Sequence, residues 1–326
     1  MSSPKVVLVT GATGKQGGAV VDALVAASTP FTILAGKKPS LSHHLTIPTN
    51  LLTSVTRDTA SSSAQKLAAK SSSIHLVQGN LDDVPGIFSA ASSVLPNEPI
   101  WGVYSVQISM GKGVTTAGEI KQGNDLIDES VKNNVSHFVY SSVERGGDEA
   151  SWENKTPIPH FQTKFEIEQH LKKNAGSMGW TVLRPVAFFD NLAPGFPSKV
   201  FLTALRDTLQ GKSIQYVATS DIGWFAAHAF EHPEEMNHKA LGLAGEELDF
   251  AGMQRAFKNA TGSDAITTYS FLGSTLMYMV TELGLMITWF GTDGYKADVG
   301  RLRQMNPKIK DMETWLKTES GWAAKA

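Results

Sequence analysis

VVLVTGATGKQGGAVVDALVAA, residues 6–27, decides the fold of this chain. Residues 6–9 are apolar and predict a buried strand, and glycines 11, 14 and 17 then predict a tight turn. The spacing of Val20, Val21 and Leu24 is typical of one face of a helix. Glycine lets the backbone approach a phosphate closely, and the free amides of a helix N-terminus bind that phosphate. The order of strand, glycine turn and helix therefore predicts a dinucleotide-binding turn.

Six residues of this turn are predicted to contact the bound dinucleotide. They are Gly11, Thr13, Gly14, Lys15, Gln16 and Gly17. The alternative is a turn whose glycines serve only the close packing of a helix against a strand. The position of the turn between an apolar strand and an amphipathic helix favours nucleotide binding.

Composition narrows the function classes. At 326 residues, the chain can bury a large core and can hold one enlarged α/β domain or two lobes. A net charge of -2 and the lack of basic runs argue against direct binding of nucleic acid. The chain has no cysteine, which excludes disulfides, thiolate catalysis and cysteine-based redox sensing. His228 and His232 are four residues apart, but no third ligand accompanies them, so we assign no metal site.

The sequence also gives expectations about cellular location and membrane contact. The N-terminal residues lead into a strand without the charged and long apolar segments of a secretory signal, so we expect a cytoplasmic protein that can also be nuclear. Residues 271–290 are long enough for a membrane span, but they include Glu282 and three threonines. We therefore expect no membrane contact and a buried or interface helix there.

Apolar runs alternate with amphipathic stretches along the first part of the chain. Strands are predicted at residues 6–10, 31–35, 74–78, 100–106, 137–141 and 181–183. This alternation predicts an α/β fold with a Rossmann-type doubly wound parallel sheet, which places ligands at the carboxyl ends of the strands.

The regular alternation fades after residue 185, where helices are predicted from about residues 200, 221, 248 and 298. We expect residues 1–190 to form the dinucleotide-binding domain and residues 191–326 a smaller C-terminal α/β lobe for a substrate or partner. Residues 214–219 and 240–244 are predicted strands that return to the main sheet, and 214–230 is expected to belong to the first domain.

The connection after the second predicted strand is unusually long. Removing residues 36–54 would join FTILA to VTRDTASSSAQKL, a normal strand, turn and helix. We interpret residues 36–54 as an insertion that is disordered or loosely packed, or that derives from retained intron sequence.

Cofactor preference follows from the same connection. A free ribose 2′-hydroxyl is gripped by Asp or Glu, and a 2′-phosphate by Arg. No acidic residue occurs between Asp22 and Asp58. If the insertion bulges out, Arg57 lies after the second strand, at the position that contacts the 2′ group of the ribose. We therefore expect NADP(H) rather than NAD(H), with Lys37 and Lys38 as alternative contacts or as part of a solvated basic loop.

Residues after the third and fourth strands are further candidates for cofactor contacts. GNLDD at 79–83 places Asn80 and Leu81 beside the adenine, although a plain turn explains the same residues. Gln107 follows the fourth strand and is expected near the ribose and pyrophosphate.

FVYSSVERGG at 138–147 and TPIPHFQTKFEIEQHLKK at 156–173 form a second constellation. His160 and Lys164 are four residues apart on one helix face, and Ser142 follows a strand end. Hydride transfer needs a cation for the nicotinamide ribose and a donor for the substrate carbonyl. Lys164 is the candidate cation, and His160 or Ser142 the candidate donor. Ordinary surface residues at helical spacing are the alternative.

These motifs together resemble the NmrA-like family, atypical members of the short-chain dehydrogenase/reductase superfamily. The resemblance rests on GATGKQGG at 11–18, YSSVERGG at 140–147, PHFQTK at 159–164, VLRPVAFFDNL at 182–192 and DIG at 221–223, and it covers nearly the whole chain except 36–54. It implies a Rossmann domain that binds NADP(H), with Val186 and Phe188 beside the nicotinamide. In the superfamily motif Tyr-x-x-x-Lys, His160 stands where the tyrosine is expected and Lys164 matches the lysine.

The family implies two functions, which the sequence leaves open. Some relatives resemble redox sensors or transcriptional co-regulators that bind the dinucleotide without turnover, so this chain would sense the NADPH/NADP ratio through a protein partner such as a transcription factor. Others resemble reductases, so it would be an NADP-dependent oxidoreductase that reduces a small hydrophobic carbonyl or enone. The absent tyrosine favours the first function, while Lys164 and Ser142 favour the second.

Overall fold

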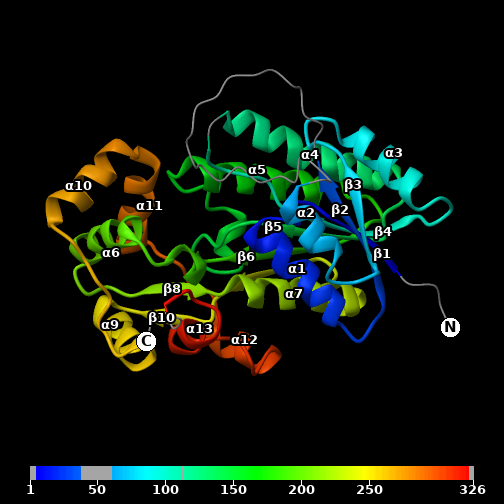
Figure 1. Ribbon diagram of the computed structural model, residues 1–326. Helices are drawn as coiled ribbons and strands as arrows, with labels where there is room; N and C mark the ends of the chain where they lie inside the picture. The colour runs from blue at the N-terminus through cyan, green and yellow to red at the C-terminus, as the bar shows by residue number, and fades with distance from the viewer. Residues whose placement is uncertain (1–4, 38–60, 112, 323–326) are drawn as a thin grey trace, which may run out of the picture. The chain divides into compact units, whose positions relative to one another are not determined.

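The structure is a computed structural model that describes residues 5–37, 61–111 and 113–322 (Figure 1). The chain folds into two compact units. The first unit comprises the chain up to Ser141 together with Glu166–Leu183 and Ile222–Lys239. The second comprises Ser142–Phe165, Arg184–Asp221 and the chain from Ala240 onward. The chain thus enters each unit more than once.

A seven-stranded sheet has the order β3-β2-β1-β4-β5-β6-β9. Its strands are β1 (Lys5–Val9), β2 (Phe31–Lys37), β3 (Ile74–Gln78), β4 (Ile100–Ser105), β5 (His137–Ser141), β6 (Gly179–Pro185) and β9 (Lys239–Leu243). Pairings among β1 to β6 are parallel, and the side chains of β1 and β5 are almost entirely buried. The predicted Rossmann-type parallel sheet is therefore confirmed. Parallel strands that are covered on both faces have continuous apolar sequences, and this is the pattern from which the sheet was predicted.

Helices connect these strands and pack against them. They are α1 (Lys15–Ala26), α2 (Ser62–Ala68), α3 (Val84–Val94), α4 (Thr116–Lys132), α5 (Pro159–Asn174) and α7 (Thr219–Glu231). Helix α1 packs against β1 and β2, α2 and α3 against β3, and α4 against β4 (Figure 1). Side-chain caps explain several helix starts: Ser61, Asp83 and Thr115 accept from the backbone amides at the N-termini of α2, α3 and α4.

A three-stranded sheet has the order β10-β8-β7, with β7 (Ala187–Phe188), β8 (Ile214–Val217) and β10 (Glu246–Leu248). The prediction that residues 214–219 return to the main sheet is therefore wrong, whereas β9 does belong to that sheet. All four side chains of β8 are buried, which is also typical of a strand in the main sheet. Its sequence therefore does not reveal that its partners are β7 and β10.

The remaining helices are α6 (Phe196–Leu209), α8 (Pro233–Met236), α9 (Phe250–Thr261), α10 (Ser270–Met279), α11 (Thr281–Thr292), α12 (Val299–Met305) and α13 (Met312–Thr318). Short 3-10 turns lie at Ala150–Trp152 and Phe189–Asn191. In the second unit, α6 packs against α10 and α11, and α9 packs against α13.

The expected single helix over residues 271–290 is instead the pair α10 and α11, bent by 114°. Val280 lies between them in a non-helical conformation. A Cβ on Gly284 would lie 2.7 Å from the carbonyl oxygen of Met277, so only glycine lets the two helices approach this closely. At the bend Tyr278 is 88% and Met279 76% exposed, so burial does not hold there and the alternative of an interface helix stays a prediction. Among the described helices, none alone is long and apolar enough to cross a membrane, although this bent pair together reaches such a length and composition.

The predicted insertion at 36–54 falls mainly outside the described residues. Its first two residues, Gly36 and Lys37, extend β2 and pair with Val77 and Gln78 of β3. The backbone of this edge of the insertion is therefore ordinary parallel strand.

A buried histidine lies within the first unit. The ring of His137 on β5 stacks on Trp101 at 6.5 Å and contacts Phe230 edge-on. Its Nε2 lies 3.0 Å from the hydroxyl of Thr181, which itself donates to a backbone carbonyl, so Nε2 carries the hydrogen. Burial lowers the pKa of His137 from 6.5 to about 4, and the charges of Lys5 and His238 add to this effect.

The free energy of unfolding should therefore fall as the pH is lowered from 6.5 towards 4. In that range the unfolded chain binds a proton at this position and the folded chain does not. When the pH falls from about 7 to 5, the free energy of unfolding of the unchanged protein should decrease by roughly 2 kcal/mol more than that of His137→Gln. Urea unfolding measures both. His75→Gln on β3 is the control and should follow the unchanged protein. An equal decrease in the free energy of unfolding for His137→Gln and the unchanged protein would contradict the claim that the buried His137 ring stays neutral.

Candidate functional site

The glycine turn between β1 and α1 has the geometry of a phosphate-binding loop. Gly11 has a φ of +62°, in the left-handed region that favours glycine. A Cβ on Gly17 would lie 2.3 Å from the carbonyl oxygen of Gly11, so no other residue fits there. Gly14 is the N-cap of α1, and no described side chain caps this helix end. A helix N-terminus that follows such a glycine turn is a typical place for a phosphate to bind.

Thr10 fixes the end of β4 beside this turn. Its Oγ1 accepts from the backbone amide of Val106 at 2.8 Å and lies 3.1 Å from the carbonyl of Tyr104. A Cβ on Gly11 would contact the side chain of Val106 at 3.0 Å. The glycine turn and the residues after β4 are therefore held together at the carboxyl edge of the sheet.

Gln16 joins the turn to two further strands. Its Oε1 accepts from the hydroxyl of Ser141 at 2.6 Å and from that of Tyr104 at 3.4 Å. Burial raises the pKa of Tyr104 well above its ordinary value, so this phenol stays protonated and donates. The side-chain oxygen of Gln16 thus orders the strand ends below the turn. Thr13 is half-buried in the turn, and Lys15 is exposed at the start of α1.

Gln107 presents a buried acceptor after β4. Its Nε2 donates to the hydroxyl of Ser105 at 2.9 Å. Its Oε1 is buried and has no hydrogen-bond partner among the residues that the structure describes. Leaving such an acceptor unsatisfied costs about 1–3 kcal/mol, and a ribose hydroxyl or a carboxamide N–H would supply the missing donor. This residue therefore fits a bound dinucleotide.

Asn80 and Leu81 form the tight turn before α3. The amide of Asp83 donates to the carbonyl of Asn80 at 2.8 Å, and the side chain of Asn80 donates to Asp82 at 2.9 Å. Leu81 is buried. The turn interpretation thus accounts for both residues, and the adenine contact stays a prediction. Arg57 and Lys38 lie outside the described residues, as does the side chain of Lys37, so the expected selector of the 2′-phosphate does too.

Ser142 begins the second unit and contacts a buried arginine. Arg145 donates from Nη1 to the hydroxyl of Ser142 at 3.3 Å and to the carbonyl of Val143 at 2.8 Å. Its other nitrogens donate to the carbonyls of Asn154 and Ser151. The hydroxyl of Ser142 is therefore placed by a guanidinium that the sequence motif did not single out.

His160 and Lys164 lie in the first turns of α5, one helical turn apart. Glu282 of α11 accepts at Oε1 from the Nδ1 of His160 at 2.6 Å and from its backbone amide at 2.8 Å. Because a carboxylate accepts, Nδ1 carries a hydrogen, which leaves Nε2 as the nitrogen for proton exchange. Lys164 is buried, with 6% of its surface exposed. The alternative of ordinary surface residues at helical spacing is therefore wrong for this pair.

Glu282 is the residue of this group that sequence reasoning missed. It is 122 positions from His160, and only the tertiary fold brings them together. The available signal was a lone carboxylate within the otherwise apolar segment 271–290. A buried or half-buried charge in such a segment needs a partner, and His160 is that partner here.

The segment after β6 divides between core and surface. Val186 is buried and donates its amide to the carbonyl of Leu243 at 3.2 Å, while Phe188 is half-buried in β7. Phe189 is fully buried and stacks on Tyr216 and Trp315, each at 5.6 Å. The aromatic pair of this motif thus includes one core residue, and the contacts of Val186 and Phe188 with nicotinamide stay predictions.

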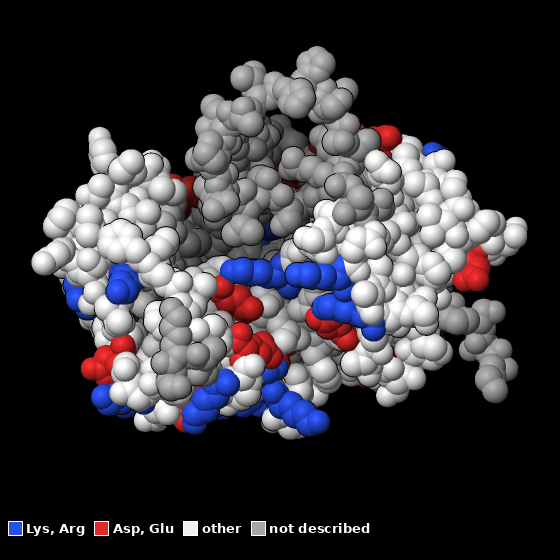
Figure 2. Space-filling view, viewed as in Figure 1, with Lys and Arg blue, Asp and Glu red and all other residues white. Residues whose placement is uncertain are grey.

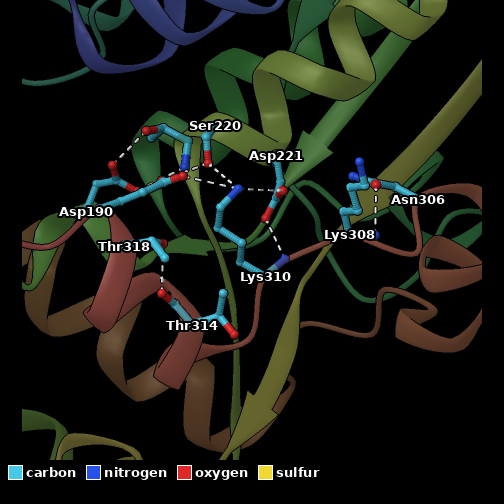
Figure 3. Close-up of polar contacts among 10 residues, drawn as sticks. Asp190, Ser220, Asp221, Asn306, Lys308, Lys310, Thr314 and Thr318 are labelled. Atoms are coloured by element: carbon cyan, nitrogen blue, oxygen red, sulfur yellow. Dashed lines mark hydrogen bonds and ion pairs between the residues drawn. The ribbon is translucent and has the colours of Figure 1, made fainter. Parts of the chain in front are cut away.

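Two motif aspartates serve the fold of the second unit (Figure 3). Asp190 accepts from the amide of Thr219 at 2.9 Å and from its hydroxyl at 2.6 Å. Asp221 is buried and accepts from the amide of Lys310 at 2.9 Å. The ammonium of Lys310 lies 3.5 Å from Asp221 and 3.1 Å from Glu319. Burial raises the pKa of Asp221, and the lysine opposes that effect.

The third residue of the DIG motif, Gly223, lies in the first unit with α1. A Cβ there would lie 2.4 Å from the carbonyl oxygen of Ala19, so the glycine permits close packing of α7 on α1. This motif is thus explained by packing and hydrogen bonding.

Charge and metal-binding groups are distributed without one dominant cluster. On the face in Figure 2, basic and acidic side chains of the described residues lie interspersed. Within the described ranges, no three His, Asp or Glu side chains are placed to hold a metal ion. His228 instead stacks on Trp224 at 4.9 Å and contacts His232 at 4.5 Å.

Comparison with known proteins identifies the family of this chain. The sequence profile of the NmrA-like family matches residues 3–316. The NmrA-like family domain-containing oxidoreductase hkm9 of Aspergillus hancockii is 25% identical over 281 residues, covering 81% of this chain and 75% of that protein.

Solved structures share the fold. NmrA, a negative transcriptional regulator in complex with NADP, has a TM-score of 0.66 and 18% identity, covering 98% of this chain and 96% of that one. Triphenylmethane reductase of Citrobacter sp., complexed with NADP(H), has 0.64 and 15%, covering 96% and 98%. NADPH-dependent quinone oxidoreductase QOR2 of Escherichia coli, complexed with NADPH, has 0.66 and 17%, covering 95% and 98%. This chain has the fold in which those proteins bind NADP or NADPH, and it belongs to the NmrA-like family.

Proposed function

We propose that this protein is an NADP(H)-dependent oxidoreductase that reduces a small, largely apolar carbonyl compound or enone. The observation that carries the proposal is the pair of His160 and Glu282, joined at 2.6 Å, one helical turn from the buried Lys164. A carboxylate that orients an imidazole, beside a buried cation, is an arrangement for moving a proton at a polarised substrate.

The glycine turn would hold the pyrophosphate at the N-terminus of α1, and Gln107 would accept from the ribose or the carboxamide. When bound, NADPH supplies a hydride with its two electrons. The relatives that bind NADP or NADPH include a regulator as well as two reductases, so the choice of enzyme rests on the residues of this chain.

Roles at the substrate are assigned to His160, Lys164 and Ser142, and Glu282 orients the histidine. Glu282 keeps the hydrogen of His160 on Nδ1. The imidazolium form would give its Nε2 proton to the oxygen of the reduced carbonyl, and the neutral ring would then regain a proton from solvent. Lys164 holds the nicotinamide ribose, and its charge stabilises the negative charge that develops on the substrate oxygen. Ser142, placed by Arg145, donates a hydrogen bond to that oxygen. His160 thus takes the role of the superfamily's tyrosine.

The test is a pH profile of NADPH oxidation for Glu282→Gln. The amide oxygen still accepts from Nδ1, but the negative charge that favours the imidazolium is lost. We expect kcat to fall about tenfold near neutral pH, and the decline of kcat with rising pH to begin at a lower pH than in the unchanged protein. KM for the carbonyl substrate should change little.

Glu153→Gln removes an exposed carboxylate of the same unit and is the control, which should keep the original profile. If Glu282 serves only as a cap for α5, its replacement would lower the melting temperature without moving the pH profile, and that result would contradict the proposed role. A protein that binds NADPH but oxidises it with no carbonyl compound, quinone or enone would contradict the oxidoreductase itself.

A second candidate function is the redox-sensing regulator, which the exposed apolar side chains at both ends of α10 favour. Tyr269, Phe271, Tyr278 and Met279 are all more than 60% exposed. Such a surface on a monomer is typical of a binding site for another macromolecule. In that function NADPH occupancy would alter the affinity of a protein partner, and binding of NADPH without oxidation would be the expected result.

A further inference from the structure

Three side chains from different elements of the first unit meet below the glycine turn. Gln16 lies in the first turn of α1, Tyr104 in β4 and Ser141 at the end of β5 (Figure 1). The hydroxyls of Ser141 and Tyr104 lie 2.6 Å and 3.4 Å from the Oε1 of Gln16. These two partners are 125 and 88 positions away from Gln16 in the sequence, so the fold alone brings the three together.

The two hydroxyls decide which end of the Gln16 amide faces them. Ser141 is 1% exposed and Tyr104 is fully buried, so each hydroxyl hydrogen needs an acceptor within the protein. The amide oxygen of Gln16 accepts from both. If the amide were turned round, its NH₂ group would meet those donors and a buried hydroxyl would lose its acceptor, which costs free energy. The oxygen of Gln16 therefore faces the strand ends, and the nitrogen faces away from them.

The side-chain nitrogen of Gln16 carries two hydrogens that can be donated. Residues 5–37, 61–111 and 113–322 provide no acceptor for either hydrogen. Gln16 is half-buried, and its nitrogen is not among the fully buried atoms that lack a partner, so an acceptor on a ligand can reach it. The contacts with Ser141 and Tyr104 thus direct two N–H groups towards a ligand.

The position of Gln16 in the glycine turn indicates which acceptor it meets. Gly14 is the N-cap of α1, and the first turn of this helix holds no acidic residue. The partial positive charge of a helix N-terminus favours an anion, and the pyrophosphate of a dinucleotide binds at such a turn. The backbone next to Gln16 is also fixed, because Gly17 packs directly on the carbonyl of Gly11. A phosphate oxygen is therefore the acceptor that suits this nitrogen.

We propose that Ser141 and Tyr104 are positioning residues for the dinucleotide: they hold the Gln16 amide so that its nitrogen donates to a pyrophosphate oxygen. The side chain of Gln16 then adds donors to the backbone amides of the turn. The sequence predicted Gln16 only as one member of the turn, and it did not predict Ser141 or Tyr104 as part of the cofactor site. This role rests on the NADP(H) binding of the proposed function, which the regulator shares, and it is independent of turnover.

Gln16→Glu tests the donor role most sharply, because the carboxylate still accepts from both hydroxyls but replaces the donor by a negative charge. Calorimetry at pH 8 should show NADP binding at least about 30-fold weaker than in the unchanged protein, since a charge-assisted hydrogen bond is replaced by repulsion. At pH 5.5 the nearby phosphate favours the protonated carboxyl, which regains an O–H donor. The ratio of the two dissociation constants should therefore be smaller at pH 5.5 than at pH 8.

A double-mutant cycle tests the positioning residues. Gln16→Met keeps much of the side-chain length without a donor and should weaken NADP binding about tenfold. Ser141→Ala frees the amide of Gln16 and should weaken binding about fivefold in the unchanged background, but less than about twofold when added to Gln16→Met. Tyr104→Phe should follow the same pattern with a smaller effect, because its contact with Gln16 is longer.

Gln304→Glu is the matched control for the change of charge. Gln304 is exposed on α12, so its replacement adds the same negative charge outside the dinucleotide site. Its affinity for NADP should stay within about twofold of that of the unchanged protein at both pH values, because salt screens exposed charges. Circular dichroism establishes that each variant is folded.

The outcomes separate this role from dinucleotide binding itself. Weaker binding in Gln16→Glu that partly recovers at pH 5.5, together with a non-additive effect of Ser141→Ala, supports the role. Equal affinity of Gln16→Glu and the unchanged protein, a loss that does not depend on pH, or additive effects in the cycle would overturn it, although the unchanged protein still binds NADP. If the unchanged protein binds no NADP, the role of Gln16 and the proposed function are both overturned.

Discussion

Gly17→Ala is expected to weaken NADPH binding by at least about 100-fold. The added Cβ would lie 2.3 Å from the carbonyl oxygen of Gly11 and 2.8 Å from the amide of Ala12. Both are backbone atoms of the turn, so the turn itself must shift. Backbone amides that bind a pyrophosphate act only when they converge on it, and a displaced turn loses several such hydrogen bonds together, each worth about 1.5–3 kcal/mol to a charged group.

Gly18→Ala is a matched control in the same helix turn. Its Cβ would lie 3.4 Å from the carbonyl oxygen of Ala12, an ordinary contact, so affinity should stay within about threefold. The fluorescence of bound NADPH measures both variants, and circular dichroism establishes that each is folded. Retention of full affinity by folded Gly17→Ala would contradict the assigned role of the turn.

Lys164→Met is expected to lower kcat about 100-fold or more with a suitable carbonyl substrate. Methionine keeps much of the length of the buried side chain and removes its charge. If Lys164 stabilises the developing oxyanion and holds the nicotinamide ribose, both contributions disappear together. The affinity for NADPH should fall less, because the pyrophosphate contacts at α1 remain.

Lys173→Met, in the last turn of the same helix, is the control because that side chain is exposed. Stopped-flow measurement of NADPH oxidation should leave it unaffected. Thermal unfolding checks that Lys164→Met is folded. A folded Lys164→Met with unaltered kcat would exclude this lysine from the chemistry.

The sheet was predictable from the sequence because its strands are buried on both faces. Residues 74–78 and 137–141 were predicted with the bounds that the structure has. The prediction for β1 differs by one residue at each end, and that for β4 by one residue at its C-terminal end. Continuous apolar runs between glycine turns and amphipathic helices leave few other topologies. The glycine spacing also predicted the turn, since Gly11 and Gly17 meet backbone constraints that only glycine satisfies.

Features that depend on partners distant in sequence were not predictable. Strand β8 has the same buried pattern as a main-sheet strand, and only its pairing with β7 and β10 assigns it elsewhere. The bend at Val280 depends on Gly284 packing against Met277. The length and apolar composition of residues 271–290 therefore led to one predicted helix where the structure has two.

In the candidate site, too, the residues recognised from the sequence are those with a local pattern, and the residues missed depend on distant contacts. His160 and Lys164 were recognised because their spacing is local. Glu282 and Arg145 were missed because each acts through a contact that the fold creates, with His160 and with Ser142. The contact of His160 with Glu282 now gives that histidine a defined tautomer, which the sequence could not supply.

Calorimetric titration of the purified protein with NADPH, NADP, NADH and NAD measures whether the chain binds a dinucleotide at all. We expect one-site binding of NADPH and NADP at micromolar or lower dissociation constants, with weaker binding of NADH and NAD. If the folded protein gives no binding heat with any of the four at two temperatures, and excludes all four in equilibrium dialysis, the account of the glycine turn is wrong.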